Sequence, residues 1–306
     1  MSNEWRVVRI DRGDHGVRLD RVLLRHLRDE KGASRNRIQR WIDAGDVLIN
    51  GAAPPRPAWR VQAGDEIRVR LALIPQRARP QAESIVLDVL YEDDDLIAVN
   101  KPAGLVVHPS FRNVSGTLIN GLLARAQSWP DGSTPALLGR LDKNTSGVVL
   151  VTKRSAIHAT LQRAMAANRI DKDYLAIVHG KPSPPRGTID LALDRDPWDR
   201  RRITVTDRGG QPSVTKYERL ATTRSHSIVR CRLITGRTHQ IRVHLATKGW
   251  PIVGDATYGP PSRFPRQALH AWRLRFTHPR MAKEVLLEAP LPADMRGLAQ
   301  ELGLPA

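Results

Sequence analysis

Asp142 is the residue whose surroundings most suggest chemistry. It lies within residues 139–147, GRLDKNTSG, two positions after an arginine and just before a group of turn-forming residues, and the apolar run VVLV at 148–151 follows at once. A carboxylate held in this way could act as a general base or as a nucleophile. The alternative is an ordinary turn aspartate whose side chain accepts hydrogen bonds from backbone N–H groups.

Two other polar segments could supply partners for this carboxylate. Residues 235–244, TGRTHQIRVH, place Arg242 in an Ile-Arg-Val run that resembles a strand, and residues 171–174, DKDY, place Tyr174 beside charged side chains. Arg140 could reach a phosphate or fill a gap in a stack of bases. Residues from separate segments can form one site, but their spacing alone does not show that they converge.

The sequence offers no motif for a metal or a nucleotide cofactor. It has no glycine-rich phosphate loop, and His239 and His244 lack the His-Glu-x-x-His spacing of a zinc-protease helix. The single cysteine, Cys231, cannot form a disulfide framework or a Cys-based zinc site. The acidic run at 92–95 is typical of a turn before a strand at 96–99. We therefore predict a protein without metal or cofactor.

The charge of the chain points to a polyanionic partner. Its 306 residues include 49 Lys and Arg against 31 Asp and Glu, which gives a net charge of +18. Such a field attracts nucleic acid first and an anionic membrane surface second, although a merely arginine-rich protein is the alternative. No apolar run approaches the ~18 residues of a membrane span, and the charged N-terminus does not resemble a secretory signal. We expect a cytoplasmic protein that binds nucleic acid and no membrane.

The length of the chain fits two domains, and residues 75–84, PQRARPQAES, are the predicted linker between them. In the larger C-terminal part, apolar runs at 96–99 and 148–151 and the alternation at 227–233 predict strands, while 155–167 has the composition of a helix. This content is mixed α/β, but periodicity does not fix the topology of the sheet.

The small N-terminal part has a regular pattern of its own. Leu19, Leu23 and Leu27 mark one face of a helix, and Ser34 is placed to cap a second helix. Two short strands follow, the first of which runs into an Asn-Gly turn. We therefore predict two helices followed by a small hairpin sheet.

The second of these helices carries Arg35, Arg37 and Arg40, which suit contact with a phosphate backbone, although a solvated helix face is the alternative. With its segments RLDRVLLRHL, SRNRIQRWIDAGDVLING and VQAGDEIRV, this part of the chain resembles the S4 RNA-binding domain. That family places its second helix against structured RNA, so the resemblance favours RNA contact by these three arginines.

The motif at 139–147 also has a counterpart in a known family. It is similar to the HRLDxxTSG motif of the RluA/RluD-type ribosomal RNA pseudouridine synthases. Three further segments resemble motifs of that family: VNKPAGLVVHP at 99–109, KDYLA at 172–176 and TGRTHQIRVHLATKGWPIVGDATYG at 235–259. With the S4-like part, the resemblance covers residues 17–290. Gly139 departs from it, because the family usually has His there, and this change could loosen local packing or alter how the loop meets RNA.

The resemblance implies an α+β fold. It predicts an S4-like αββ module at 17–74, a linker at 75–84, and a catalytic domain at 85–306 whose central, largely antiparallel sheet is flanked by helices. A monomer is the default expectation, because no feature of the sequence indicates a partner surface. Chemistry of this family needs no metal or cofactor.

The resemblance also implies a role for each candidate residue. Asp142 is the implied catalytic carboxylate, and Arg242 is the partner that could hold it ionised. Tyr174 is implied to stack on the uracil. Arg140 resembles the residue that takes the space left by a base after it leaves its stack.

The implied reaction is isomerisation of uridine to pseudouridine in structured RNA, with large-subunit ribosomal RNA as the expected substrate. A synthase acting on transfer RNA is one alternative, and a non-catalytic ribosome assembly factor tethered by its S4 module is another. A carboxylate-dependent nuclease or glycosidase is the third. Residues 181–215, which include three arginines at 200–202, are less family-like and could form a substrate-specific loop or a solvated turn.

Overall fold

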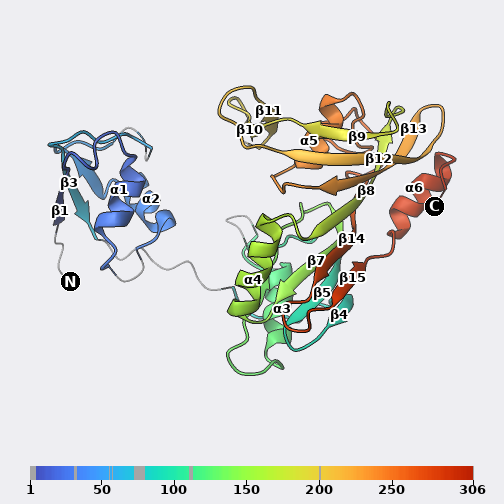
Figure 1. Cartoon of the computed structure of the whole chain (residues 1–306), viewed down its shortest axis with the longest axis horizontal. Coiled ribbons are helices and arrows are strands. Elements are labelled where there is room, and N and C mark those ends of the chain that lie inside the picture. Colours follow the sequence, from blue (N-terminus) through green and yellow to red (C-terminus); the bar gives the residue numbers. More distant parts are fainter. Residues whose placement is uncertain are drawn as a thin grey trace. The chain divides into compact units, whose positions relative to one another are not determined.

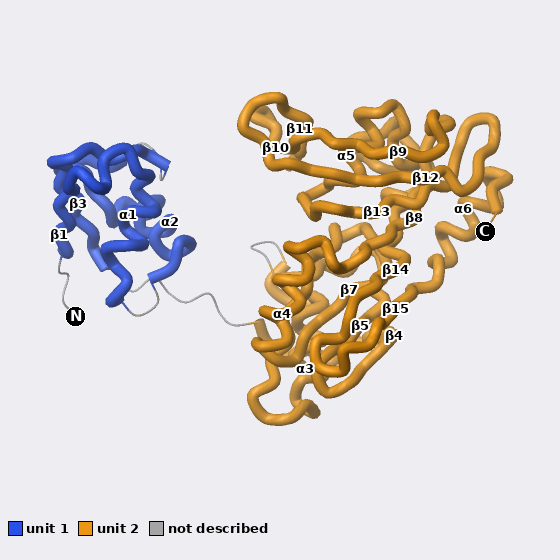
Figure 2. The backbone as a smooth tube through the Cα atoms, viewed as in Figure 1, with its two compact units in different colours: residues 1–79 blue, residues 80–306 orange. Residues whose placement is uncertain are grey.

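The chain forms two compact units, residues 1–79 and residues 80–306, shown in different colours in Figure 2. The structure is a computed structural model. It describes residues 5–30, 33–54, 56, 58–71, 80–109, 113–199 and 201–305. Half of the predicted linker, residues 75–79, and Arg200 of the arginine cluster lie outside the described residues.

Unit 1 combines two helices with a three-stranded antiparallel sheet of order β1-β3-β2. Its elements are β1 (Trp5–Arg9), α1 (Leu19–His26), α2 (Arg35–Asp43), β2 (Val47–Ile49) and β3 (Glu66–Arg70) (Figure 1). The predicted helices and hairpin are confirmed, and the Ser34 hydroxyl caps α2 by accepting the Arg37 N–H. One strand, β1, precedes the expected elements. The sequence did not predict β1, because its residues include charged side chains and its only described strand partner, β3, is distant in the chain.

Unit 2 is built around one large sheet of order β4-β5-β7-β14-β8-β13-β12-β9, with β6 added beside β7 and β15 beside β14. Its strands are β4 (Val89–Glu92), β5 (Leu96–Lys101), β6 (Ala136–Leu137), β7 (Ser146–Thr152), β8 (Asp171–His179), β9 (Arg186–Asp190), β12 (Val214–Thr222), β13 (His226–Leu233), β14 (Leu269–Thr277) and β15 (Glu284–Glu288). Among the strand pairs of the described residues, only β7 and β14 run parallel. The predicted largely antiparallel sheet is confirmed.

Helices cover the faces of this sheet, as the fold class predicts (Figure 1). They are α3 (Leu118–Ala126), α4 (Ser155–Ala166), α5 (Gln240–Thr247) and α6 (Ala293–Glu301). Strand β7 is buried on both faces: Val148 and Leu150 belong to the core that includes α4, whereas Val149 and Val151 belong to the core that includes α3. This double burial explains why β7 is a continuous apolar run rather than an alternating one.

A tight seam joins the two halves of the sheet where β14 lies between β7 and β8. Ala271 on β14 pairs with Gly147 on β7 and with Tyr174 on β8. A Cβ atom at position 147 would lie 2.1 Å from the Ala271 carbonyl oxygen, and the backbone φ of Gly147 is +114°. Only glycine suits both conditions. The seam therefore fixes the start of β7, just after the Asp142 turn, one strand away from Tyr174.

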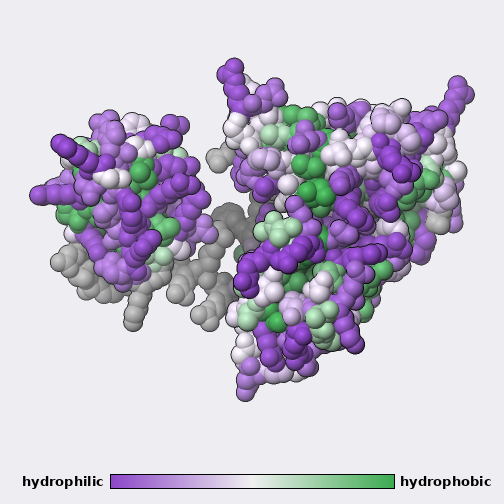
Figure 3. Space-filling view, in the orientation of Figure 1, coloured by the Kyte–Doolittle hydropathy of each residue, from purple (hydrophilic) through white to green (hydrophobic). Residues whose placement is uncertain are grey.

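Outside this sheet, a short hairpin of β10 (Leu193–Arg195) and β11 (Ile203–Val205) occupies the middle of the less family-like segment. The molecular surface in the view of Figure 3 is mainly hydrophilic, with small hydrophobic areas. Among the described residues, no helix is long and apolar enough to cross a membrane.

Candidate active site

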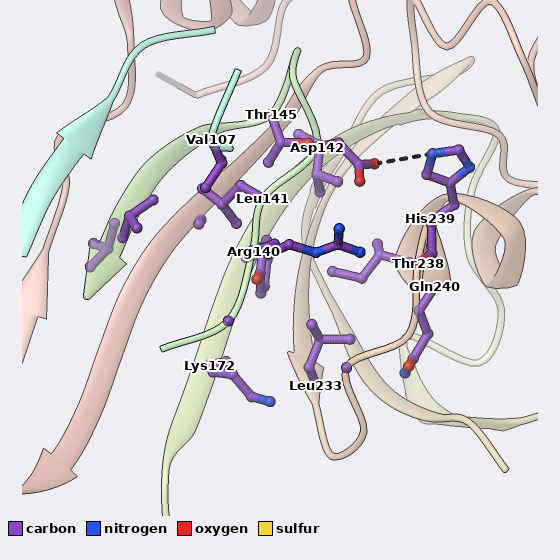
Figure 4. Close-up of a pocket in the computed structure, with 18 of the residues that line it drawn as sticks. Val107, Arg140, Leu141, Asp142, Thr145, Lys172, Leu233, Thr238, His239 and Gln240 are labelled. Carbon is purple, nitrogen blue, oxygen red and sulfur yellow. Dashed lines mark ion pairs between the residues drawn. The ribbon is translucent and has the colours of Figure 1, made fainter. Parts of the chain in front are cut away.

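A cavity of about 530 Å³ lies at this seam and brings the predicted residues of unit 2 together. Asp142, Arg140, Tyr174 and Arg242 all line it, although they come from a loop, from β8 and from α5. Figure 4 shows the loop that carries Asp142 facing the segment 238–240 across the cavity. The structure thus supplies the convergence that residue spacing alone could not show.

The Asp142 side chain makes no hydrogen bond within its own turn in the described part of the chain. The turn is closed by the backbone, because the Thr145 N–H donates to the Asp142 carbonyl at 3.1 Å. The carboxylate oxygen Oδ2 instead accepts a hydrogen bond from Arg242 Nη1 at 3.0 Å. The ordinary-turn interpretation of Asp142 therefore does not hold, and the carboxylate is available to a ligand in the cavity.

The turn itself is held by cations beneath it. Lys101 is fully buried, and its Nζ donates to the carbonyls of Pro102, Leu105 and Lys143, each at 2.9 Å. Arg266 Nη1 donates to the Asn144 carbonyl at 3.2 Å. The bonds to Lys143 and Asn144 fix the backbone just after Asp142, so the position of its carboxylate is largely set before any ligand binds.

Lys101 should make the reaction rate depend on pH. Burial and the nearby Arg266 lower the pKa of Lys101 to about 8, although the Asp142 carboxylate opposes this change. A neutral amine has only two N–H groups for the three carbonyls, so its deprotonation loosens the turn. We expect the single-turnover rate constant to fall as the pH rises through about 8. Circular dichroism over the same pH range controls for unfolding, and a rate constant that stays level well above pH 8 would contradict the prediction.

Arg242 is fixed by a second carboxylate, Asp255. Its Nε and Nη2 atoms donate to the two Asp255 oxygens at 2.7 and 2.8 Å, and only Nη1 points to Asp142. Burial by itself would raise the pKa of Asp255, but hydrogen bonds from Arg242 and from the Thr257 and Tyr258 N–H groups lower it. Asp255 thus holds the guanidinium in the orientation that places its third nitrogen beside the Asp142 carboxylate.

The predicted strand around Arg242 is wrong, because Arg242 lies in α5. The β-branched Ile241 and Val243 favoured a strand in the sequence. In the structure, residues 240–245 are buried on every side, which removes the polar stripe that usually identifies a helix. The Gln240 side chain accepts hydrogen bonds from the Thr235 hydroxyl and the Arg237 N–H, which secures the turn before the helix.

Tyr174 presents its ring to the cavity from β8. Burial, with a smaller contribution from the Asp142 carboxylate, raises the pKa of its hydroxyl. The hydroxyl therefore stays protonated near neutral pH and can donate a hydrogen bond but not act as a base. Within the described part of the chain it has no hydrogen-bond partner, which leaves both the ring and the hydroxyl for a ligand.

Arg140 is exposed on the loop before Asp142, and in Figure 4 its side chain extends into the cavity toward Thr238. Gly139 beside it has a backbone φ of +96°, and the space where its Cβ would lie is open. A histidine there would be strained in the present loop conformation.

The three arginines of α2 belong to unit 1 and differ in their surroundings. Arg35 Nε lies 3.2 Å from the buried carboxylate of Asp20. The Arg37 guanidinium lies 5.2 Å from the centre of the Trp41 ring. Arg40 is exposed and is hydrogen-bonded to the backbone of its own helix. Two of the three cations therefore also contact the core of their own unit.

Sequence reasoning missed several residues that support the site. Lys101, His239, Asp255 and Tyr258 all lie inside the quoted motifs, yet nothing in their spacing assigns them a partner. The contacts that define them join distant positions, such as Arg242 with Asp142, which are 100 residues apart. The many polar residues among the apolar ones of segment 235–259 were the one sequence feature that could have pointed to these supporting residues.

Comparison with known proteins places both units in known families. The family model for RNA pseudouridylate synthases matches residues 95–247, and the model for the S4 domain matches residues 17–67. An uncharacterized RNA pseudouridine synthase of Bacillus subtilis, YlyB, is 41% identical over 89% of this chain and 91% of its own length. Ribosomal large subunit pseudouridine synthase D of Neisseria meningitidis serogroup A is 40% identical over 95% of this chain and 80% of its own length.

Among solved structures, human RNA pseudouridylate synthase domain containing 4 superposes with a TM-score of 0.59 and is 26% identical. The match covers 72% of this chain and 94% of the human chain. Both the sequence and the fold point to the same family as the Asp142 motif. The chain belongs to the RNA pseudouridylate synthase family and carries an S4 domain ahead of its synthase domain.

Proposed function

We propose that this protein converts specific uridines of large-subunit ribosomal RNA to pseudouridine, with Asp142 as the reactive carboxylate. The observation that carries the proposal is the Asp142–Arg242 pair beside Tyr174 in a cavity of about 530 Å³. That volume suits a small ligand such as a single nucleoside. The choice of RNA rests on relatives named ribosomal large subunit pseudouridine synthase D, which match nearly the whole chain.

The reaction breaks the bond between N1 of uracil and C1′ of the ribose and forms a bond between C5 and C1′. The proton on C5 is released to solvent, and N1 gains a proton, so the reaction consumes no electrons or energy source. Asp142 either attacks C1′ as a nucleophile or removes the C2′ proton as a base. Arg242 offsets the negative charge of the carboxylate in both routes. Tyr174 provides a flat surface on which the uracil can turn.

The target uridine must leave its stack before its C1′ reaches Asp142. Extrusion of a base costs a few kcal/mol, which contacts with the rest of the RNA must offset. We assign Arg140 to the vacated space, and this is supported by its exposure and by its side chain, which extends into the cavity. The net charge of +18 supplies attraction to the RNA backbone.

We assign RNA contact outside the cavity to the S4 domain, through Arg35, Arg37 and Arg40. The exposed Arg40 is the most available of the three. We further propose that the S4-like module extends over 17–74 and the catalytic domain over 85–306, with the linker at 75–84 between them. An RNA-modifying enzyme of this kind would act as a monomer in the cytoplasm, where ribosomal RNA is made in bacteria.

The competing functions have less support. The nuclease alternative would use the acidic run at 92–95, which forms a turn between β4 and β5. Asp93 accepts hydrogen bonds from two backbone N–H groups of that turn, and Asp95 is paired with Arg280 at 2.6 Å. These carboxylates already have structural partners, and they do not line the cavity.

The proposal can be tested with unmodified RNA transcripts. Large-subunit ribosomal RNA, with transfer RNA as a second substrate, is incubated with the protein or with its Asp142→Ala variant. Pseudouridine is then mapped by carbodiimide-dependent stops in primer extension. We expect new stops in large-subunit RNA with the wild type only. Stops in transfer RNA alone would reassign the substrate, and binding without stops in either RNA would favour a non-catalytic assembly factor.

A further inference from the structure

His239 is a second polar residue that faces the carboxylate of Asp142. Its Nε2 atom lies 3.8 Å from Asp142 Oδ2, the contact marked by the dashed line in Figure 4. This distance exceeds a direct hydrogen bond, but such contacts are often long before the substrate binds. The backbone of His239 is left-handed, with a φ of +55°, at the residue that precedes α5. A residue other than glycine in this conformation at a cavity suggests a function that the strain serves.

The surroundings of His239 determine which ring nitrogen carries its proton. The Tyr258 hydroxyl accepts the Ile203 N–H at 2.8 Å and lies 2.9 Å from His239 Nδ1. Burial raises the pKa of Tyr258, so its hydroxyl keeps a proton to donate. Among the described residues Nδ1 of His239 is the acceptor within its reach. A hydroxyl that donates to Nδ1 places the ring proton on Nε2, the nitrogen that faces Asp142.

The surroundings of His239 favour the neutral imidazole ring near neutral pH. Burial lowers the pKa of His239, and Arg242 lowers it further, while the Asp142 and Asp255 carboxylates oppose the change. A neutral ring with its proton on Nε2 donates to a carboxylate without neutralising it. It can thus orient Asp142 and leave the charge needed for reaction in place.

Both partners of the carboxylate reach the same oxygen. Arg242 Nη1 donates to Oδ2, and His239 Nε2 faces Oδ2 as well. In the described part of the chain, Oδ1 has no hydrogen-bond partner. We propose that His239 is a positioning residue which, with Arg242, holds Oδ2 and thereby presents Oδ1 as the atom that reacts with the ribose. This inference rests on the proposed role of Asp142.

The hairpin of β10 and β11 takes part in this arrangement. Ile203, whose N–H holds the Tyr258 hydroxyl, is the first residue of β11. The Arg202 and Arg242 guanidinium groups lie 5.5 and 5.1 Å from the centre of the Tyr258 ring. The less family-like segment is thus connected to Asp142 through Tyr258 and His239, and the hairpin backbone helps to fix the proton on His239 Nε2.

Two substitutions of His239 separate this role from a purely structural one. In Gln the side-chain amide reaches the position of Nε2, whereas in Asn it reaches only the position of Nδ1. We expect His239→Gln to keep most of the single-turnover rate and His239→Asn to lose roughly 10- to 100-fold, with unchanged RNA affinity for both. A backbone role predicts the opposite order, because Asn tolerates the left-handed conformation better than Gln.

A second measurement needs no RNA. Nitrogen-15 spectra of the histidine-labelled full chain report which ring nitrogen of His239 is protonated. We expect the proton on Nε2 in the wild type and loss of this preference in Tyr258→Phe, which keeps the ring but lacks the hydroxyl. A proton on Nδ1 in the wild type, or a variant in which Asn is as active as Gln, would overturn the inference. An inactive wild type would instead refute the proposed function, and the spectra would still test the tautomer.

Discussion

The Asp142→Asn variant is expected to bind substrate RNA as the wild type does and to form pseudouridine at least ~10⁴-fold more slowly. Asparagine has nearly the same shape as aspartate, and its amide oxygen can still accept the Arg242 Nη1 hydrogen bond. It can neither attack C1′ nor remove a proton. Arg242 keeps its two bonds to Asp255, so the fold should be unaffected.

The rate of pseudouridine formation by this variant can be measured from the release of tritium. The C5 hydrogen of uracil must leave when C5 bonds to C1′, so RNA carrying tritium at C5 releases it to water on each turnover. Single-turnover release gives the rate constant, a binding assay gives the RNA affinity, and the melting temperature controls for folding. A rate constant within tenfold of the wild type would show that Asp142 is not the reactive group.

The Arg242→Met variant is expected to lose both stability and activity. Asp255 has no exposed side-chain surface, and the substitution would leave its carboxylate without the guanidinium that neutralises it. An uncompensated buried charge of this kind costs about 3–5 kcal/mol of the free energy of unfolding. The Asp142 carboxylate would lose its only direct side-chain hydrogen bond among the described residues.

A matched double variant separates the two losses. Arg242→Met combined with Asp255→Asn removes the buried charge, and the Asn oxygen can still accept the Thr257 and Tyr258 N–H groups. We expect urea unfolding to show most of the lost stability restored, while tritium release stays at the level of the single variant. Recovery of activity in the double variant would mean that Arg242 acts only through the fold. Normal stability of the single variant would contradict the buried-charge argument.

Much of the fold could be predicted where one face of an element is buried and the other exposed. The leucine spacing of α1 and the alternation of β13 are such cases, and both elements are confirmed. The prediction failed for α5, which is buried all round and has no polar stripe. It also missed β1, since its only strand partner lies about sixty residues further along the chain.

The site was predictable only in part. The family motifs pointed to Asp142, Tyr174 and Arg242, and the structure places all three at one cavity. Their supporting groups could not be found in this way, because a buried ion pair leaves no periodic signal in the sequence. Asp255 is 13 residues from the arginine it orients, and Lys101 is 42 residues from the Lys143 carbonyl it binds.

The place of β14 in the sheet has a consequence for synthesis of the protein on the ribosome. The strands β7 and β8 follow each other in the chain, but in the sheet the C-terminal β14 lies between them. In a nascent chain, β7 and β8 are therefore translated well before β14, the strand that lies between them in the sheet. The Asp142 turn and Tyr174 cannot reach their final separation until β14 inserts, so the cavity is completed only after β14 has been translated.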